Sequence, residues 1–257
     1  MMASPLLRTM YNWSSQFVDP LRFVRGIQGL DWYVRDCRAY RRIPGAEQFG
    51  WRDLEPALHE RSVTHGIDSH YFYANAWAIR RVIATSPRRH VDIASQSVFV
   101  SLASAIVPMI YLDYRLLSAP LSGMRSIVGT LLALPFRNGS IDSLTCLHVA
   151  EHVGLGRYGD PLDPLGTRKA TAELRRVLAP GGNLLFAVPV GRERVAFNAH
   201  RIHAPATIID YFRDLELVEL SGVDDAGHYQ ERVASGALAD NRYGCGFFWF
   251  RKSDTRD

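Results

Sequence analysis

After Pro87, short apolar runs alternate with stretches of helical pattern, and this alternation constrains the fold more than any other feature of the 257-residue sequence. It is typical of a parallel sheet with helices on both faces. We therefore expect an α/β fold. The predicted strands cover residues 90–94, 107–112, 126–128, 143–147, 183–189, 215–220 and 244–252. The predicted helices between them cover residues 97–105, 167–178 and 206–212.

One segment is long enough to be mistaken for a membrane span. Ile93 to Leu112 holds 20 consecutive residues without a formal charge, and about 20 apolar residues cross a bilayer. However, the segment contains four serines, a glutamine and a proline, and Asp92 and Asp113 bracket it. We interpret it as strand, turn, buried helix and strand, and we predict no transmembrane segment.

The N-terminal third has a different character. Residues 1–90 carry 13 Arg against 8 acidic residues, although the whole chain has a net charge of only +4. An amphipathic helix is predicted at 14–42 and a second helix, rich in aromatic residues and Ala, at 69–85, with a Gly- and Pro-containing linker at 43–53. We expect residues 1–86 to form an Arg-rich helical extension and residues 87–257 to form the main domain. The helix at 14–42 either packs on that domain or lies on a membrane surface as a peripheral contact.

Cysteine usage indicates the compartment. The three cysteines, Cys37, Cys146 and Cys245, are widely spaced and form no CxxC motif. This pattern argues against a disulfide framework and for a reducing, cytoplasmic location. The N-terminus also lacks the pattern of a signal peptide.

Candidate ligand-binding residues follow the predicted strands, because open α/β sheets bind ligands at the carboxyl ends of their strands. Asp113 ends the second strand, where a carboxylate can accept hydrogen bonds from both hydroxyls of a ribose. His148, Glu151 and His152 follow the fourth strand. The same strand-end position is also ordinary for turn and cap residues.

An ordered set of motifs carries a family resemblance. Leu134-Pro135-Phe136 precedes the fourth strand, Glu151-His152 follows it, and a helix then ends in Arg176-Val177-Leu178-Ala179-Pro180-Gly181-Gly182. Residues 88–190 thus resemble class I S-adenosylmethionine-dependent methyltransferases of the small-molecule type. The resemblance implies a Rossmann-like, mostly parallel seven-stranded sheet with an antiparallel last strand. The chain looks especially similar to an uncharacterised branch associated with polysaccharide biosynthesis.

The resemblance also implies residue roles. Asp113 would bind the ribose, Thr130 and Leu131 would border the adenine, and His148 would lie beside the methyl donor. The full set implied for S-adenosyl-L-methionine is Asp92, Ala94, Ser95, Gln96, Asp113, Tyr114, Thr130, Leu131 and His148. Two positions depart from the family pattern: the first motif has no glycine, and Thr130 replaces the acid that usually contacts adenine.

Methyl transfer to a hydroxyl requires removal of a proton, and an unperturbed histidine is suited to this at neutral pH. The candidates for this catalytic role are Glu151, His152, His200 and His203. The alternatives are that Glu151 and His152 form a purely structural pair, and that His200 and His203 lie in a solvated loop. These histidines could also converge with Asp160 and Asp163 on a metal, but their spacing matches no standard site, and we predict none.

The Gly- and Pro-rich loop at 154–166 is long for a compact domain, and such loops are often functional. We expect it to act as a lid over the substrate. Arg157 and Tyr158 from this loop, together with Asn198, are the predicted substrate-binding residues.

The leading hypothesis is a methyltransferase acting on a small-molecule or glycan hydroxyl, with O-methyl transfer favoured. The alternative is a catalytically inactive methyltransferase-fold protein that serves as a binding or scaffold module. A nicotinamide dehydrogenase is disfavoured because GxGxxG is absent after the first strand. No nucleic-acid partner is predicted, because Arg and aromatic residues do not interleave near the site.

Overall fold

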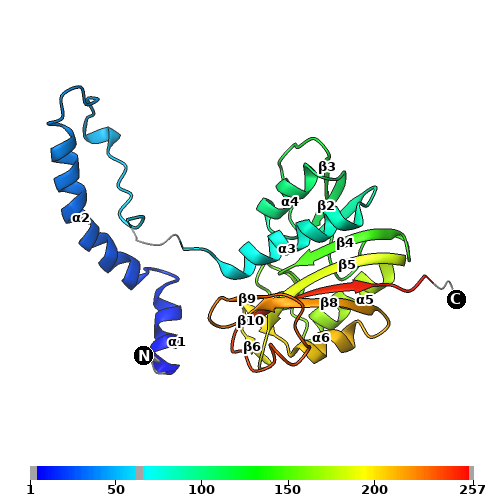
Figure 1. Cartoon of the computed structure of the whole chain (residues 1–257). Coiled ribbons are helices and arrows are strands. Elements are labelled where there is room, and N and C mark those ends of the chain that lie inside the picture. Colours follow the sequence, from blue (N-terminus) through cyan, green and yellow to red (C-terminus); the bar gives the residue numbers. More distant parts are fainter. Residues whose placement is uncertain (1–4, 62–65, 255–257) are drawn as a thin grey trace. The chain divides into compact units, whose positions relative to one another are not determined.

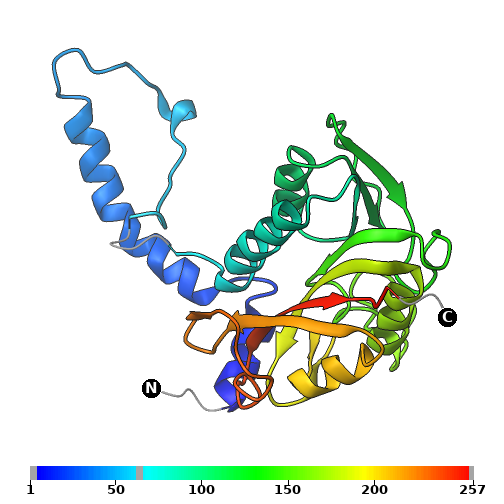
Figure 2. The same ribbon diagram turned by 45° about the vertical axis from the view of Figure 1, so that its right-hand side comes forward.

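The computed structural model describes residues 5–61 and 66–254. It divides into two compact units, Met1–Gly66 and Ile67–Asp257, which are described separately (Figures 1 and 2). Residues 1–4 and 62–65 of the expected N-terminal extension and residues 255–257 of the expected main domain lie outside the described residues. No helix in the described ranges is long and apolar enough to cross a membrane.

The first unit is built on two helices, α1 (Pro5–Ser14) and α2 (Pro20–Tyr40), followed by a short 3-10 helix, η1 (Trp51–Asp53). The helix expected at 14–42 begins later, at Pro20. The reason is Asp19, whose carboxylate caps α2 by accepting hydrogen bonds from the backbone N–H groups of residues 21 and 22 at 3.0 Å. A proline at the first helical position adds to this start signal.

The second unit contains an eight-stranded sheet in the order β3-β2-β1-β4-β5-β10-β8-β9. The first five strands in this order are parallel, and β10 is antiparallel to both of its neighbours. The expected antiparallel last strand is therefore confirmed. The strands are β1 (His90–Ile93), β2 (Met109–Asp113), β3 (Met124–Val128), β4 (Ile141–Leu147), β5 (Leu178–Val190), β8 (Glu216–Val223), β9 (Tyr229–Gln230) and β10 (Gly244–Arg251).

The structure adds elements that the sequence did not predict. The two-residue strand β9 makes eight strands rather than seven, and β6 (Arg194–Ala196) pairs with β7 (His200–Ile202) in a separate hairpin. These strands are too short to produce a readable alternation. In addition, Pro180, Gly181 and Gly182 lie within β5, where the register shifts and Gly181 has a φ of 72°. The segment between the predicted helix and the predicted strand at 183–189 is thus a bulge inside a longer strand.

Helices cover both faces of this sheet (Figures 1 and 2). On one face, α3 (Ser69–Thr85) and α4 (Ser97–Ser104) bury an aromatic cluster that includes Trp77, Phe99 and Phe247. On the other face, α5 (Gly166–Val177) and α6 (Pro205–Tyr211) enclose a second cluster that includes Leu174 and Phe186. The sequence interpretation of Ile93 to Leu112 as strand, turn, buried helix and strand is confirmed.

The helix α3 has the bounds predicted from sequence, but it belongs to the second unit. Its residues Ala74, Trp77, Ala78 and Val82 are buried against the sheet. The compact units therefore divide near residue 66, twenty residues before the expected boundary. Without α3, one face of the sheet would expose a large apolar area to water.

Candidate functional site

The carboxyl ends of the parallel strands frame a crevice between β1 and β4. The chain leaves β1 toward α4 on one face and leaves β4 toward α5 on the other face. This divergence opens the sheet at its carboxyl edge, the usual position of ligands in such folds. Three adjoining pockets lie there, and His148 lines all three.

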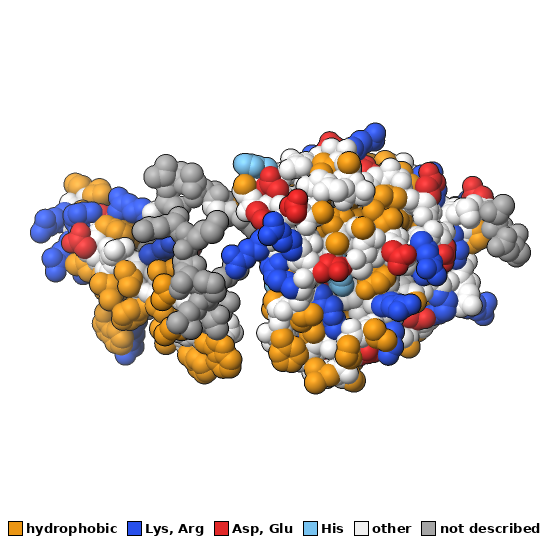
Figure 3. All heavy atoms as spheres, turned by 90° about the horizontal axis from the view of Figure 1, so that it is seen from below, with side chains coloured by type: hydrophobic (Ala, Val, Ile, Leu, Met, Phe, Trp, Pro, Cys, Tyr) orange, Lys and Arg blue, Asp and Glu red, His pale blue; other side chains and the backbone are white. Residues whose placement is uncertain are grey.

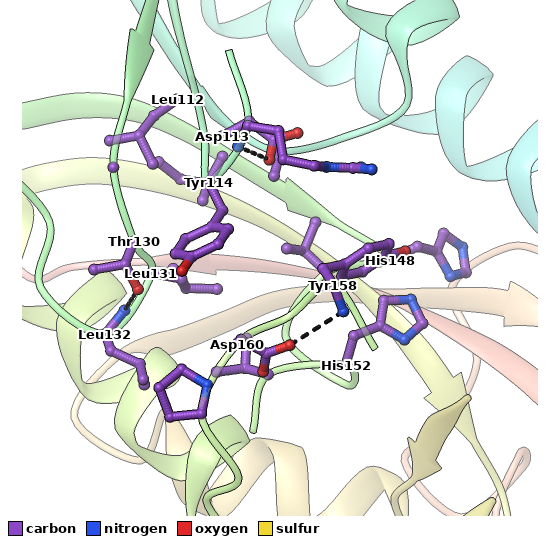
Figure 4. Close-up of a pocket in the computed structure, with 17 residues that line it drawn as sticks. Leu112, Asp113, Tyr114, Thr130, Leu131, Leu132, His148, His152, Tyr158 and Asp160 are labelled. Carbon is purple, nitrogen blue, oxygen red and sulfur yellow. Dashed lines mark hydrogen bonds between the residues drawn. The ribbon is translucent and has the colours of Figure 1, made fainter. Parts of the chain in front are cut away.

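We name the pockets by their walls. The apolar pocket is lined chiefly by Leu112, Tyr114, Thr130, Leu131, Val149 and Pro161 (Figure 4). The turn pocket is lined chiefly by Ala94, Ser95, Gln96, Tyr111, Arg115 and Leu147. The polar pocket is lined chiefly by His70, Tyr71, Glu151, Arg157, His200 and Tyr243.

The turn after β1 adopts a conformation that glycine usually supplies. Ala94 has a φ of 52°, in the left-handed region, although it carries a Cβ. Ser95 holds the turn from both sides: its N–H donates to Asp92 Oδ1 at 3.0 Å, and its Oγ accepts from the Leu147 N–H at 3.1 Å. The turn therefore holds a left-handed residue although it contains no glycine.

Asp92 supports this turn from below. Its side chain is fully buried, and in the described chain it lines none of the three pockets. The expectation that Asp92 contacts a cofactor is corrected accordingly. Its Oδ2 accepts a hydrogen bond from the Thr145 hydroxyl, which also lies 2.9 Å from His90 Nε2. His90 Nδ1 is 2.8 Å from the Ser143 hydroxyl, which completes a buried polar chain.

Burial shifts both ionisable groups of this chain. It lowers the pKa of His90 to about 4, because no charged partner compensates for the loss of water. It raises the pKa of Asp92 to about 6, although the hydrogen bonds from Ser95 and Thr145 oppose the shift. At neutral pH the chain therefore joins a neutral imidazole to a carboxylate.

Asp113 ends β2 at the border between the apolar and turn pockets (Figure 4). Its Oδ2 accepts from the Tyr111 hydroxyl at 2.8 Å, and its Oδ1 accepts from the Arg115 N–H at 3.0 Å. These bonds fix the carboxylate, and each oxygen keeps a further lone pair. Such a group can accept hydrogen bonds from two neighbouring hydroxyls.

Tyr158 stands opposite Asp113 and comes from the loop at 154–166. The Arg115 guanidinium lies over its ring at 4.8 Å, a cation–π contact. Asp160 shapes this part of the loop by accepting from the N–H groups of Gly154 at 2.6 Å and Tyr158 at 3.3 Å. In addition, Arg201 donates to the carbonyl of Asp163 at 2.9 Å. The expected lid is thus an anchored loop that forms part of the pocket walls.

Glu151 is the central charge of the polar pocket and is only 1% exposed. Its Oε1 lies 3.5 Å from His148 Nδ1 and 3.7 Å from His152 Nε2. Burial would raise the pKa of this carboxyl, but the two imidazoles outweigh burial and hold it below its ordinary value. Its Oε2 has no hydrogen-bond partner among the described residues. The pocket therefore holds a buried carboxylate with one unsatisfied oxygen.

The orientation of His152 identifies its tautomer. Nδ1 lies 2.6 Å from the carbonyl oxygen of Ala199, so this nitrogen carries the proton and donates. The lone pair is then on Nε2, on the side of Glu151. Burial lowers the pKa of His152 below its ordinary value. His152 is consequently neutral at pH 7 and available as a proton acceptor.

The other predicted residues divide into two groups. His200 and Arg157 line the polar pocket, where the His200 ring stacks on Tyr243 at 4.8 Å and burial lowers its pKa to about 4. His203 packs beside Tyr211, and Asn198 is exposed near the β6–β7 hairpin. Neither of these two lines any of the three pockets formed by the described residues, so they are not brought to the site.

Sequence reasoning missed the contributions of two regions. His70 and Tyr71 begin α3, and Tyr243 precedes β10, yet all three line the polar pocket. Burial raises the pKa of Tyr71 and of Tyr243 to about 12. The polar His70 at the start of an apolar helix was the available signal, but helix periodicity alone did not show that α3 reaches the carboxyl edge.

Comparison with known proteins was made by sequence family, by curated sequences and by solved structures. Residues 124–230, less than half of the chain, match the family model "Caenorhabditis protein of unknown function, DUF268". The comparison with curated protein sequences gives no significant match.

Three solved structures illustrate the structural likeness. The first is 1,6-didemethyltoxoflavin-N1-methyltransferase from Burkholderia thailandensis with bound S-adenosylhomocysteine, at 14% identity and a TM-score of 0.50, with 70% of this chain and 79% of that chain covered. The second is a proposed methyltransferase from Bacillus halodurans C-125, at 16% identity and a TM-score of 0.50, with 70% and 98% covered. The third is the [4+2]-cyclase SpnF, at 15% identity and a TM-score of 0.50, with 71% and 81% covered. At these identities the likeness establishes the fold. The chain therefore has the Rossmann-like fold of the class I S-adenosylmethionine-dependent methyltransferases.

Proposed function

We propose that the protein is an S-adenosylmethionine-dependent methyltransferase that acts on a hydroxyl of a small molecule or glycan. The observation that carries this proposal is the position of Asp113. Its fixed carboxylate borders both an apolar pocket and the left-handed turn at Ala94, and the polar pocket with Glu151 and His152 adjoins them.

The residues present fit the proposed cofactor. Asp113 would accept hydrogen bonds from the ribose hydroxyls, and Leu112 and Leu131 would flank the adenine. Ala94 has the left-handed backbone conformation that glycine usually supplies, so the turn can approach a ligand although the Ala94 Cβ narrows the space. When bound, S-adenosylmethionine supplies an electrophilic methyl group on its sulfonium sulfur.

His152 is the proposed general base. Its Nδ1–H is held by the Ala199 carbonyl at 2.6 Å, which leaves Nε2 free to accept the proton of an acceptor hydroxyl. Glu151 Oε1, 3.7 Å from Nε2, then stabilises the imidazolium that forms. Positioning of the acceptor supplies the remaining acceleration.

The polar pocket suits a hydroxyl-rich acceptor. Tyr71 and Tyr243 bring aromatic rings to this pocket, the second with His200 stacked on it, and Arg157 and His200 bring hydrogen-bonding groups. Flat aromatic faces and polar edges of this kind are suited to sugars, which supports O-methyl transfer in polysaccharide biosynthesis. The three cysteines are free thiols in the structure, in keeping with a cytoplasmic place for this activity.

Residues 14–42 are proposed as a peripheral membrane contact. In α2 the side chains of Phe23, Ile27, Leu30 and Val34 form one exposed stripe at three- and four-residue spacing. Figure 3 shows hydrophobic side chains gathered on this N-terminal unit beside several Arg residues. An apolar stripe flanked by Arg is typical of helices that lie in the interface of anionic membranes.

The test is transfer of labelled methyl from S-adenosylmethionine to hydroxyl-bearing acceptors, with His152→Gln as the variant. We expect kcat to fall by about 10²–10⁴-fold, the usual contribution of a general base. His203→Gln, which alters a buried histidine outside the pockets, should leave kcat nearly unchanged. Because burial lowers the pKa of His152, wild-type kcat should decline only below pH 6.5, as the imidazole becomes protonated.

A second function is favoured by two specific observations. The Cβ of Ala94 occupies the turn, and both oxygens of Asp113 already accept hydrogen bonds from the protein. These features suit a catalytically inactive protein that retains the fold as a binding or scaffold module. Methyl transfer by the purified protein, abolished by Asp113→Ala, would eliminate this alternative.

A further inference from the structure

Three potential metal ligands meet between the start of α3, the end of β4 and the start of β10. They are His70, His148 and Cys245, and one ligand atom from each lies within 4.8 Å of the other two. All three side chains are largely removed from water, with exposed fractions of 9%, 8% and 0%. They come from distant parts of the sequence, so the cluster cannot be recognised from a spacing motif.

The spacing of the ligand atoms approaches that of a zinc site. With Zn–N and Zn–S bonds of about 2.0 and 2.3 Å in tetrahedral geometry, neighbouring ligand atoms are roughly 3.3–3.8 Å apart. His148 Nε2 and Cys245 Sγ are already separated by 3.4 Å. The His70 ring stacks parallel to that of His148, with centroids 5.9 Å apart. The His70 ligand atom lies within 4.8 Å of the other two, so it would move closer to them when a metal binds.

Glu151 supplies a second, independent feature of metal sites. A histidine that binds metal through one ring nitrogen usually donates the other N–H to a carboxylate, which fixes its orientation. His148 has this arrangement: Nε2 faces Cys245, and Nδ1 lies 3.5 Å from Glu151 Oε1. Glu151 Oε2 is buried and has no partner within the described residues.

We propose that His70, His148 and Cys245 bind a zinc ion. Two imidazoles and one thiolate form a donor set that zinc favours. On binding, the Cys245 thiol releases its proton to solvent and the thiolate forms the bond to zinc, so affinity rises with pH. The charges then balance: the zinc ion offsets the Cys245 thiolate and the buried Glu151 carboxylate.

The site leaves one coordination position open. His70, His148 and Glu151 line the polar pocket, so the fourth position is accessible to water or to a ligand bound there. Three protein ligands with an open position are typical of catalytic rather than structural zinc. This consequence rests on the proposed function: the zinc ion would bind the acceptor oxygen and make its hydroxyl a better proton donor to His152.

The experiment uses full-length protein stripped of metal with a chelator and then titrated with zinc or cobalt alone. We expect one zinc ion per chain, and with cobalt a thiolate-to-metal charge-transfer band in the near ultraviolet. Cys245→Ser should abolish this band, and His70→Ala should weaken binding of both metals. Glu151→Gln should weaken zinc binding by about 10–100-fold, as expected for a carboxylate behind a ligating histidine.

Cys146→Ser is the matched control, because Cys146 is equally buried on β4 and belongs to the hydrophobic core rather than to this cluster. It should retain the band. Circular dichroism of each variant establishes that it is folded. Absence of stoichiometric zinc from the wild type, or persistence of the band in folded Cys245→Ser, would overturn the proposal. Titration of the same samples with S-adenosylhomocysteine separates this outcome from failure of the proposed function.

Discussion

Ala94 carries a backbone conformation that L-residues with a Cβ seldom adopt, with a φ of 52°. A left-handed conformation costs such a residue about 1–2 kcal/mol, whereas glycine adopts it freely but loses more entropy on folding. We therefore expect Ala94→Gly to raise the free energy of unfolding by up to about 1 kcal/mol. Because Ala94 lines both the apolar and the turn pocket, the variant should also bind S-adenosylhomocysteine more tightly.

Urea denaturation and calorimetry measure these two effects. The matched control is Ala74→Gly, a buried alanine inside α3, which should lose about 1 kcal/mol or more. A loss of stability in Ala94→Gly comparable to that of the control would contradict the account of the turn.

In the buried chain of hydrogen bonds at His90, the donor and the acceptor of each bond follow from counting the available hydrogens. The Thr145 hydroxyl has one proton and donates it to Asp92, so His90 Nε2–H must donate to Thr145 Oγ1. His90 Nδ1 then accepts from Ser143. In Asp92→Asn the amide becomes a donor, every bond of the chain reverses, and the His90 proton moves to Nδ1. Nitrogen chemical shifts of the imidazole distinguish the two tautomers; an unchanged tautomer would refute this assignment.

The same variant should change the dependence of stability on pH. The folded-state pKa of His90 is lowered from 6.5 to about 4, so its contribution is present above pH 6.5 and is lost as pH falls toward 4. The pKa of Asp92 is raised from 3.8 to about 6, so its contribution is present below pH 3.8 and is lost as pH rises toward 6. The two slopes oppose each other in the wild type. Asp92→Asn should therefore be destabilised more steeply between pH 6 and 4.

At the scale of elements, a buried ion pair attaches α3 to the sheet. Arg81 Nη2 lies 2.6 Å from Glu219 Oε1 on β8, and the Trp77 indole N–H donates to the same oxygen at 2.8 Å. Arg81→Met removes the close cation of this buried carboxylate and leaves only the exposed Arg232 at 3.9 Å, and we expect the free energy of unfolding to fall by about 3–5 kcal/mol. The double variant Arg81→Met/Glu219→Leu should lose less, because no buried charge is left unpaired; Glu231, the other partner of Arg81 at 3.0 Å, is exposed to water.

Chemical denaturation of both variants tests this account of α3. Arg213→Met is the control, because Arg213 is exposed and its ion pairs are 3.9–4.0 Å long, so stability should change by less than about 0.5 kcal/mol. Equal losses in the single and double variants would show that the pair does not hold α3 as described.

The exposed stripe on α2 gives a second prediction at this scale. Full-length protein should sediment with vesicles containing anionic phosphatidylglycerol and much less with neutral phosphatidylcholine vesicles. Phe23→Glu/Ile27→Glu places two acids in the stripe and should reduce binding strongly. Leu102→Glu, at an apolar position of α4 that is 54% exposed, is the control and should bind like the wild type. Equal binding of the wild type and both variants to anionic vesicles would contradict the proposed membrane contact of α2.

At the scale of the whole molecule, local sequence patterns predicted those elements that depend on continuous apolar runs. The strands from β1 to β5, β8 and β10 were found from such runs, and their topology follows from the alternation with helices. The assignment of α3 to the sheet could not be predicted, because periodicity shows that a helix has an apolar face but not what that face covers. The hairpin β6–β7 and the strand β9 are too short to carry a pattern.

In the candidate site too, residues marked by a local pattern could be predicted, and contacts between distant segments could not. Asp113, His148 and Glu151 were predicted because strand ends mark the edge of the sheet. The partners of Asp92 depend on the register that places Asp92 opposite Thr145, and the cluster of His70, His148 and Cys245 depends on three distant segments meeting. Contacts between such distant segments cannot be predicted from the spacing of residues along the sequence.

The central claim is that the crevice at the carboxyl edge binds the nucleoside of S-adenosylmethionine through Asp113. Isothermal calorimetry of the full-length protein with S-adenosylhomocysteine tests it, with Asp113→Asn as the variant and the exposed Asp142→Asn on β4 as the control. We predict saturable binding that Asp113→Asn weakens by roughly 10–150-fold, since hydrogen bonds to a charged group contribute about 1.5–3 kcal/mol, and that Asp142→Asn leaves unchanged. No binding by folded protein at millimolar ligand, or equal affinity in Asp113→Asn, would contradict it.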